Sequence, residues 1–93
     1  MDSLKQTEKI VKISKVLSDS NRMEIIKLLN KRSMCVHAIV CHLNISQPAV
    51  SKHLKQLAGI GLLVSEKKGM YVHYSLKKEI LLNYLNDIEK IVS

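Results

Sequence analysis

Apolar side chains recur along the chain with two different spacings, and these spacings predict its elements. From residue 4 to residue 43, and again from 46 to 57, apolar residues return every three or four positions, as in amphipathic helices. Around Gly69, residues 62–68 and 70–76 are rich in strand-forming side chains and alternate with polar ones, which is typical of a β-hairpin. A broad apolar face then follows from Lys77 onward. We therefore expect a mainly α fold with a small β-hairpin, in the order of four helices, two strands and a fifth helix.

Capping and breaking residues set the expected boundaries. The first helix should cover residues 4–17, and the second should start at one of three candidate N-caps in residues 18–20 and end near Lys31. A short third helix fits residues 36–43. Ser46 is the expected N-cap of the fourth helix, and glycines at positions 59 and 61 are expected to stop it.

Length and composition favour one globular domain over residues 1–93. The chain has 93 residues, of which 46% are apolar and 25% charged. No apolar run approaches the roughly 18 residues of a membrane span, and the first residues lack the apolar stretch of a signal peptide, so we expect a cytoplasmic protein without membrane contact. Two cysteines in that setting are expected to be free thiols. The sequence also lacks a Gly-rich phosphate loop and a group that would orient a Cys–His pair, which argues against an enzyme.

Positive charge is concentrated in the first three quarters of the chain. The formal net charge is +7, and residues 46–76 hold four lysines against one acid, whereas residues 77–93 are neutral. This excess indicates an anionic partner, with nucleic acid the leading candidate. The neutral last segment must serve another purpose.

The helix expected after Ser46 has a narrow apolar stripe, formed by Val50, Leu54 and Leu57, and an opposite face of small and polar side chains. A recognition helix needs this division, because one face anchors it while the other enters a major groove about 12 Å wide. Together with the preceding helix and the following hairpin, it matches a winged helix-turn-helix. The residues that we expect to contact double-stranded DNA are Ser46, Gln47, Ala49, Ser51, Lys52, His53, Lys55, Lys67 and Lys68.

Three segments in this order resemble the arsenical-repressor (ArsR/SmtB) family of bacterial and archaeal transcription regulators. Residues 17–26 are similar to the opening Leu-Ala-Asp-Pro-Thr-Arg-Leu-x-Ile-Leu of the family, residues 46–57 to its recognition-helix signature, and residues 61–76 to its wing. The resemblance covers residues 8–76 closely. It implies a homodimeric repressor on a pseudo-palindromic operator.

The resemblance also implies that the terminal helices, at about residues 4–17 and 77–92, form the dimer interface. The residues of the last helix support this independently, because it has more apolar surface than a small core requires and carries no net charge. The alternative interpretation is an ordinary core helix.

Members of the family often respond to a metal or metalloid, and here the match is partial. Arsenical sensors carry Cys-Val-Cys followed by a third Cys; Cys35 falls on the first of these positions, His37 replaces the second, and Cys41 comes one residue late. A thiolate and an imidazole suit a soft metal ion, so Cys35 and His37 are the candidate effector residues, with Cys41 as a conceivable third ligand. The family's other metal site, on the last helix, is absent, since no His follows His73.

Three alternatives for the signal stay open: a soft metal ion or metalloid, thiol chemistry, and another effector or none. The sequence also allows a winged-helix module that contacts proteins instead of DNA. Such modules often lose the outward lysines, which are retained here, and only DNA binding should fall steeply with rising salt.

Overall fold

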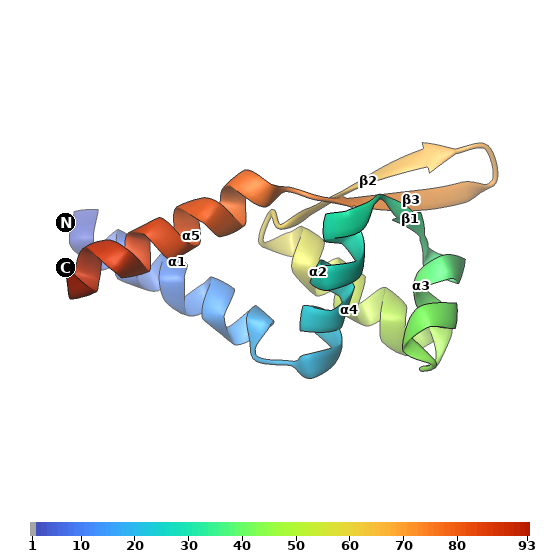
Figure 1. Cartoon of the computed structure of the whole chain (residues 1–93), viewed down its shortest axis with the longest axis horizontal. Helices are drawn as coiled ribbons and strands as arrows, with labels where there is room; N and C mark the ends of the chain where they lie inside the picture. Colours follow the sequence, from blue (N-terminus) through green and yellow to red (C-terminus); the bar gives the residue numbers. More distant parts are fainter. Residues whose placement is uncertain (1) are drawn as a thin grey trace.

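The chain begins with two helices joined by a sharp bend (Figure 1). In the computed structural model, which describes residues 2–93, α1 covers Asp2–Leu17 and α2 covers Ser20–Lys31. Asp19 caps α2, because its carboxylate accepts hydrogen bonds from the backbone N–H groups of Asn21 at 2.8 Å and Arg22 at 3.2 Å. The central one of the three candidate caps therefore starts this helix.

The helix-turn-helix is formed by α3 (Val36–Leu43) and α4 (Gln47–Gly59). Asn44 makes the turn between them in the left-handed conformation, with φ 55° and ψ 40°, which Asn adopts more readily than most residues. The predicted cap of α4 is confirmed, since the Ser46 hydroxyl accepts a hydrogen bond from the backbone N–H of Ala49 at 3.2 Å.

Of the two glycines expected to stop α4, only Gly61 lies beyond the end of the helix. Gly59 is the last residue of α4, whereas Gly61 takes a left-handed φ of +83°. The turn at Gly61 leads the chain into the hairpin, and the backbone N–H of Leu62 bonds back to the carbonyl of Leu57 at 3.1 Å. The stop therefore depends on Gly61, where a side chain would be strained.

The sheet has three strands, one more than the sequence predicted. β2 (Leu63–Lys68) and β3 (Tyr71–Leu76) form the expected antiparallel hairpin, and β1 (Met34–Cys35) pairs with the other edge of β3. The prediction of four helices before the first strand was therefore incomplete. Two residues are too few to show an alternating pattern, and β1 is a strand only because β3 lies beside it.

The last helix, α5 (Lys78–Val92), lies antiparallel along α1, so both ends of the chain are at the same end of an elongated molecule of 44 × 23 × 21 Å (Figure 1). A hydrogen bond of 2.7 Å between the hydroxyls of Ser14 and Tyr84 joins the two helices. The buried apolar side chains come from the elements other than α5 and from the segments beside them: Ile13, Ile25, Ile26, Leu29, Met34, Ile39, Val50, Leu54, Leu57, Leu62 and Leu63.

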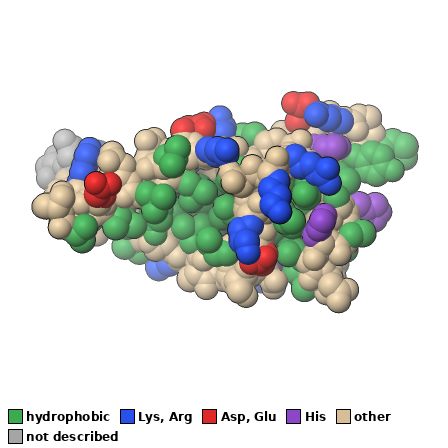
Figure 2. Space-filling view, viewed as in Figure 1, with side chains coloured by type: hydrophobic (Ala, Val, Ile, Leu, Met, Phe, Trp, Pro, Cys, Tyr) green, Lys and Arg blue, Asp and Glu red, His purple; other side chains and the backbone are tan. Residues whose placement is uncertain are grey.

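No residue of α5 is buried. Apolar side chains remain on the surface between α5 and α2 (Figure 2), where they line a hollow of about 510 Å³. None of the described helices combines the length and the apolar character needed to cross a membrane.

Candidate nucleic-acid interface

The side chains of α4 are divided between the core and the solvent. Val50, Leu54 and Leu57 are all 0% exposed, which fixes the helix to the body of the protein. On the remaining surface, the predicted contacts are exposed or half-buried: Ser46, Gln47, Ala49, Ser51, Lys52 and Lys55. Neither Lys52 nor Lys55 has an ion-pair partner among the described residues. Their charges are therefore available to an anionic ligand.

The hairpin carries a second basic site at its tip. Lys67 and Lys68 are exposed at the end of β2, beside the turn at Gly69, whose φ is +61°. The Lys68 ammonium lies 3.9 Å from the carboxylate of Glu66, and both side chains are more than half exposed. Since such surface pairs contribute little, this contact leaves Lys68 free to bind a phosphate.

His53 faces α2 and not the solvent. Its side chain is 14% exposed, with Nδ1 3.2 Å from Nη1 of Arg22 and Nε2 4.0 Å from Oδ1 of Asp19. Because a guanidinium only donates hydrogen bonds, Nδ1 is the acceptor and the ring proton is assigned to Nε2. We therefore revise the expected role of His53 from a DNA contact to a contact between α4 and α2.

The hydrogen bond from the backbone N–H of Arg22 holds the pKa of Asp19 below its ordinary value. The N–H of Asn21, the neighbouring His53 ring and the positive charge of Arg22 act in the same direction, against partial burial. A carboxyl whose pKa is lower in the folded state stabilises the fold above its unfolded pKa, and this contribution is lost as the pH falls through the folded pKa.

Asp19→Asn should therefore lower the urea midpoint at pH 7, although Asn still caps the helix. The difference from the parent should shrink below about pH 4, where the carboxyl of Asp19 becomes protonated in the unfolded chain while it is still ionised in the folded protein. Urea unfolding at pH 7, 5 and 3 measures this difference, with Glu89→Gln as a control for an exposed carboxylate on another helix. A difference that stays constant down to pH 3 would contradict the stabilising role of the Asp19 charge.

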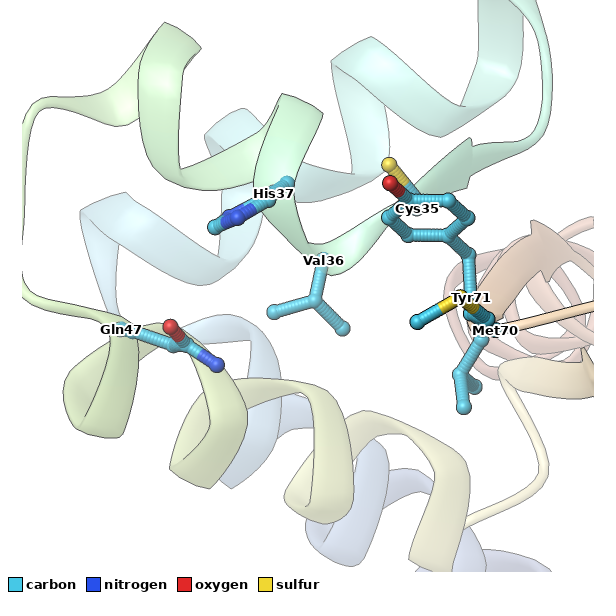
Figure 3. Close-up of a pocket in the computed structure, with 7 residues that line it drawn as sticks. Cys35, Val36, His37, Gln47, Met70 and Tyr71 are labelled. Carbon is cyan, nitrogen blue, oxygen red and sulfur yellow. The ribbon is translucent and has the colours of Figure 1, made fainter.

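The two effector candidates line a cavity of about 310 Å³ between the start of α3, the start of α4 and the hairpin. Figure 3 shows Cys35, Met70 and Tyr71 on one side of this cavity and His37 and Gln47 on the other. The full lining consists of Cys35, Val36, His37, Gln47, Met70, Tyr71 and Val72. The cavity thus joins the effector candidates to Gln47, a predicted base contact.

The residues around this cavity do not fit a metal ion held by one chain. Within residues 2–93 the structure places no group of three or more His, Cys, Asp or Glu side chains where they could share an ion. The conceivable set of Cys35, His37 and Cys41 is therefore wrong. Cys35 lies half-buried in β1 and Cys41 is exposed on α3, both as free thiols. Cys35 and His37, which lie on opposite sides of the cavity (Figure 3), also fall short of the four ligands that a structural zinc site uses.

Arg22 and Gln56 form a link that the sequence analysis missed. Nη1 of Arg22 donates to Oε1 of Gln56 at 2.6 Å, and Nε donates to the backbone carbonyl of Val16. A signal was present in the sequence: a cation in the first turn of a helix opposes the helix dipole. Another interaction must therefore hold Arg22 at that position.

A helix anchored on one side and cationic on the other, preceded by a short helix and followed by a basic hairpin, defines a winged helix-turn-helix regulator that binds DNA. The sequence model described as "Bacterial regulatory protein, arsR family" matches residues 19–65. The chain therefore belongs to the ArsR family, as the resemblance in its sequence indicated.

Individual relatives agree with this assignment. The chain is 37% identical over 81 residues to the "Arsenical resistance operon repressor" of Staphylococcus xylosus, covering 87% of this chain and 77% of that protein. It is 34% identical over 74 residues to the "Transcriptional repressor SdpR" of Bacillus subtilis, covering 80% and 82%. The structure of an ArsR-like transcriptional regulator from Rhodococcus sp. RHA1 matches with a TM-score of 0.84 at 27% identity, over 91% of this chain and 80% of that chain. The protein is a transcriptional regulator, and the expectation that it is not an enzyme agrees with these repressor relatives.

Proposed function

We propose that the protein is a cytoplasmic homodimeric repressor, which binds a pseudo-palindromic operator with α4 of each protomer in the major groove. The observation that carries this proposal is the exposure of Gln47, Lys52 and Lys55 on a helix whose opposite face is fully buried. Two such helices would enter successive major grooves about 34 Å apart. Repression follows because the bound dimer occludes the promoter.

Within this complex, the side chains divide into groups that read sequence and groups that hold the backbone. Gln47 and Ser51 have the hydrogen-bonding groups to contact base edges from the first turns of α4. Lys52, Lys55 and the two lysines of the hairpin would neutralise phosphates. Ser46, the N-cap, and Ala49 lie at the start of α4, the end of a recognition helix that contacts base edges.

Dimerisation through α1 and α5 is supported by the surface that these helices leave uncovered. Leu82, Leu85 and Ile91 of α5 are 63%, 58% and 59% exposed, and Leu4 of α1 is 64% exposed. An exposed apolar surface of this extent on a small protein marks an interaction site. The neutral charge of residues 77–93 suits contact with an identical segment, since a basic one would repel its copy.

The test is a titration of the protein against DNA from upstream of its own gene at several salt concentrations. Four proposed phosphate-binding lysines per protomer make eight per dimer, so log K should fall against log salt with a slope of about −7, at about 0.9 per phosphate contact. An affinity that does not change with salt would contradict DNA binding through these lysines and favour a protein-binding module.

Substitutions on α4 should separate base contacts from phosphate contacts. Gln47→Ala should relax the preference among operator bases, with a loss of about 1–3 kcal/mol of discrimination at one position of each half-site. Lys52→Ala should weaken binding to all duplexes alike and reduce the salt slope by about 2 per dimer. Competition with operator and random duplexes measures both effects. If both variants bound the operator like the parent, α4 would not be the recognition helix.

Release from DNA by a signal is the remaining part of the proposal. Gln47 lines the same cavity as Cys35 and His37. A molecule bound in this cavity would therefore compete with DNA for the Gln47 side chain, and this arrangement supports the cavity as the effector site. The reduced protein–operator complex should be titrated with Zn(II), Cu(I), Cd(II), As(III) and an oxidant. Release by one of them that Cys35→Ser abolishes would assign the signal to this thiol. A complex indifferent to all of them would remove Cys35 and His37 as effector residues.

A further inference from the structure

Arg22 contacts three separate parts of the fold with one guanidinium group. Its Nε donates to the carbonyl of Val16 in the last turn of α1, and its Nη1 donates to Oε1 of Gln56 and approaches Nδ1 of His53 on α4. Arg22 itself belongs to the first turn of α2. A single side chain therefore joins the end of α1, the start of α2 and the middle of α4.

The positions of the three groups that Arg22 contacts explain why one guanidinium can join them. The carbonyl of Val16 is among the last four of α1, and such carbonyls have no N–H donor within their own helix. Gln56 and His53 are three residues apart on α4 and so present one face of the helix. The planar guanidinium offers donors in a fixed geometry that an ammonium group lacks, so lysine at this position would keep the charge but lose the combined contacts.

We infer that Arg22 is a positioning residue that fixes the orientation of α4 relative to α1. The inference rests on the proposed function, in which α1 belongs to the dimer interface and α4 enters the groove. In such a dimer, the orientation of α4 on α1 determines the separation of the two recognition helices. Arg22 thereby determines which half-site spacing the dimer accepts, although it contacts no DNA.

The experiment compares Arg22→Lys with the parent on the operator found by the upstream titration and on duplexes with one or two base pairs inserted between the half-sites. Each inserted pair moves the half-sites apart by about 3.4 Å and rotates one about the helix axis. The parent should discriminate against the insertions. Arg22→Lys should bind the original operator about tenfold more weakly, because hydrogen bonds to a charged group are lost, and should discriminate less among the spacings.

Two further variants make the test specific. Arg32→Lys is the matched control, since Arg32 is exposed at the other end of α2 and no hydrogen bond joins it to α4 in the described part of the chain; it should retain the spacing preference. Gln56→Ala removes one contact of Arg22 from an exposed position, so it should fold even where Arg22→Lys does not. As a single variant, Gln56→Ala should weaken the discrimination among spacings. Combined with Arg22→Lys, it should add little further loss, because the effects of interacting residues are not additive.

The outcomes separate this inference from the proposed function. If the parent binds no duplex specifically, the proposed function fails first. If the parent binds but Arg22→Lys keeps its affinity and spacing preference, the positioning role is overturned. It is also overturned if Arg22→Lys weakens binding to all duplexes equally and its loss is additive with that of Gln56→Ala. That result would show that Arg22 acts independently of its contact with α4.

Discussion

Leu82→Glu is expected to convert the protein into a monomer and to weaken operator binding by a factor of about 10² or more, because the two half-sites are then no longer bound together. Leu82 is 63% exposed and has no part in the core. The protomer should therefore fold normally. In a dimer formed through α5, however, the new carboxylate would be buried without a partner. This burial would cost about 3 kcal/mol or more, because the group is charged.

Sedimentation velocity and the operator titration measure the two effects, and far-UV circular dichroism checks the fold. Asn83→Glu is the matched control, because it adds the same charge one position along α5 at an exposed polar residue. The control should remain dimeric. A dimer of Leu82→Glu with the affinity of the parent would exclude this face of α5 from the interface.

Leu54→Ala is expected to lower the free energy of unfolding by about 2–5 kcal/mol, the usual cost of truncating a leucine in a packed core. Leu54 is 0% exposed and anchors α4 among the residues of the core. Since small domains have a total stability of about 5–15 kcal/mol, this loss would leave a substantial unfolded population at moderate urea.

Lys55→Ala, one position along the same helix, is expected to weaken DNA binding and to leave the stability almost unchanged. Lys55 is exposed, so its truncation should change stability by no more than about 0.5 kcal/mol while weakening DNA binding and reducing the salt slope. Urea unfolding and the salt titration distinguish the two variants. Comparable losses of stability in both would contradict the division of α4 into an anchored face and a DNA face.

Local patterns in the sequence were sufficient to predict most of the elements. The boundaries of α3 agree with the expected residues 36–43, and Ser46 caps α4 as predicted. These features depend on residues within one or two helical turns of each other. The hairpin around Gly69 was predictable for the same reason, because alternation and a turn residue are both local signals.

The candidate site was only partly predictable. A helical wheel places His53 at the edge of the apolar stripe, which is compatible with facing either the groove or α2, and only the packing of α2 decides between them. The partners Arg22 and Gln56 are 34 residues apart in the chain. The motif around Cys35 suggested a metal ligand set, but the half-buried strand position of Cys35 and the exposed position of Cys41 keep the thiols from completing one.

The sequence by itself determined the winged helix-turn-helix, the basic outer face of α4 and the neutral, apolar last helix, because helix period, capping and charge are properties of neighbouring residues. The tertiary structure decided that β1 is a strand, that His53 faces inward, that Arg22 joins α1 to α4, and that Cys35, His37 and Gln47 share one cavity. These contacts join elements that are separate in the chain. They depend on how the helices pack around the buried side chains, which no local pattern specifies.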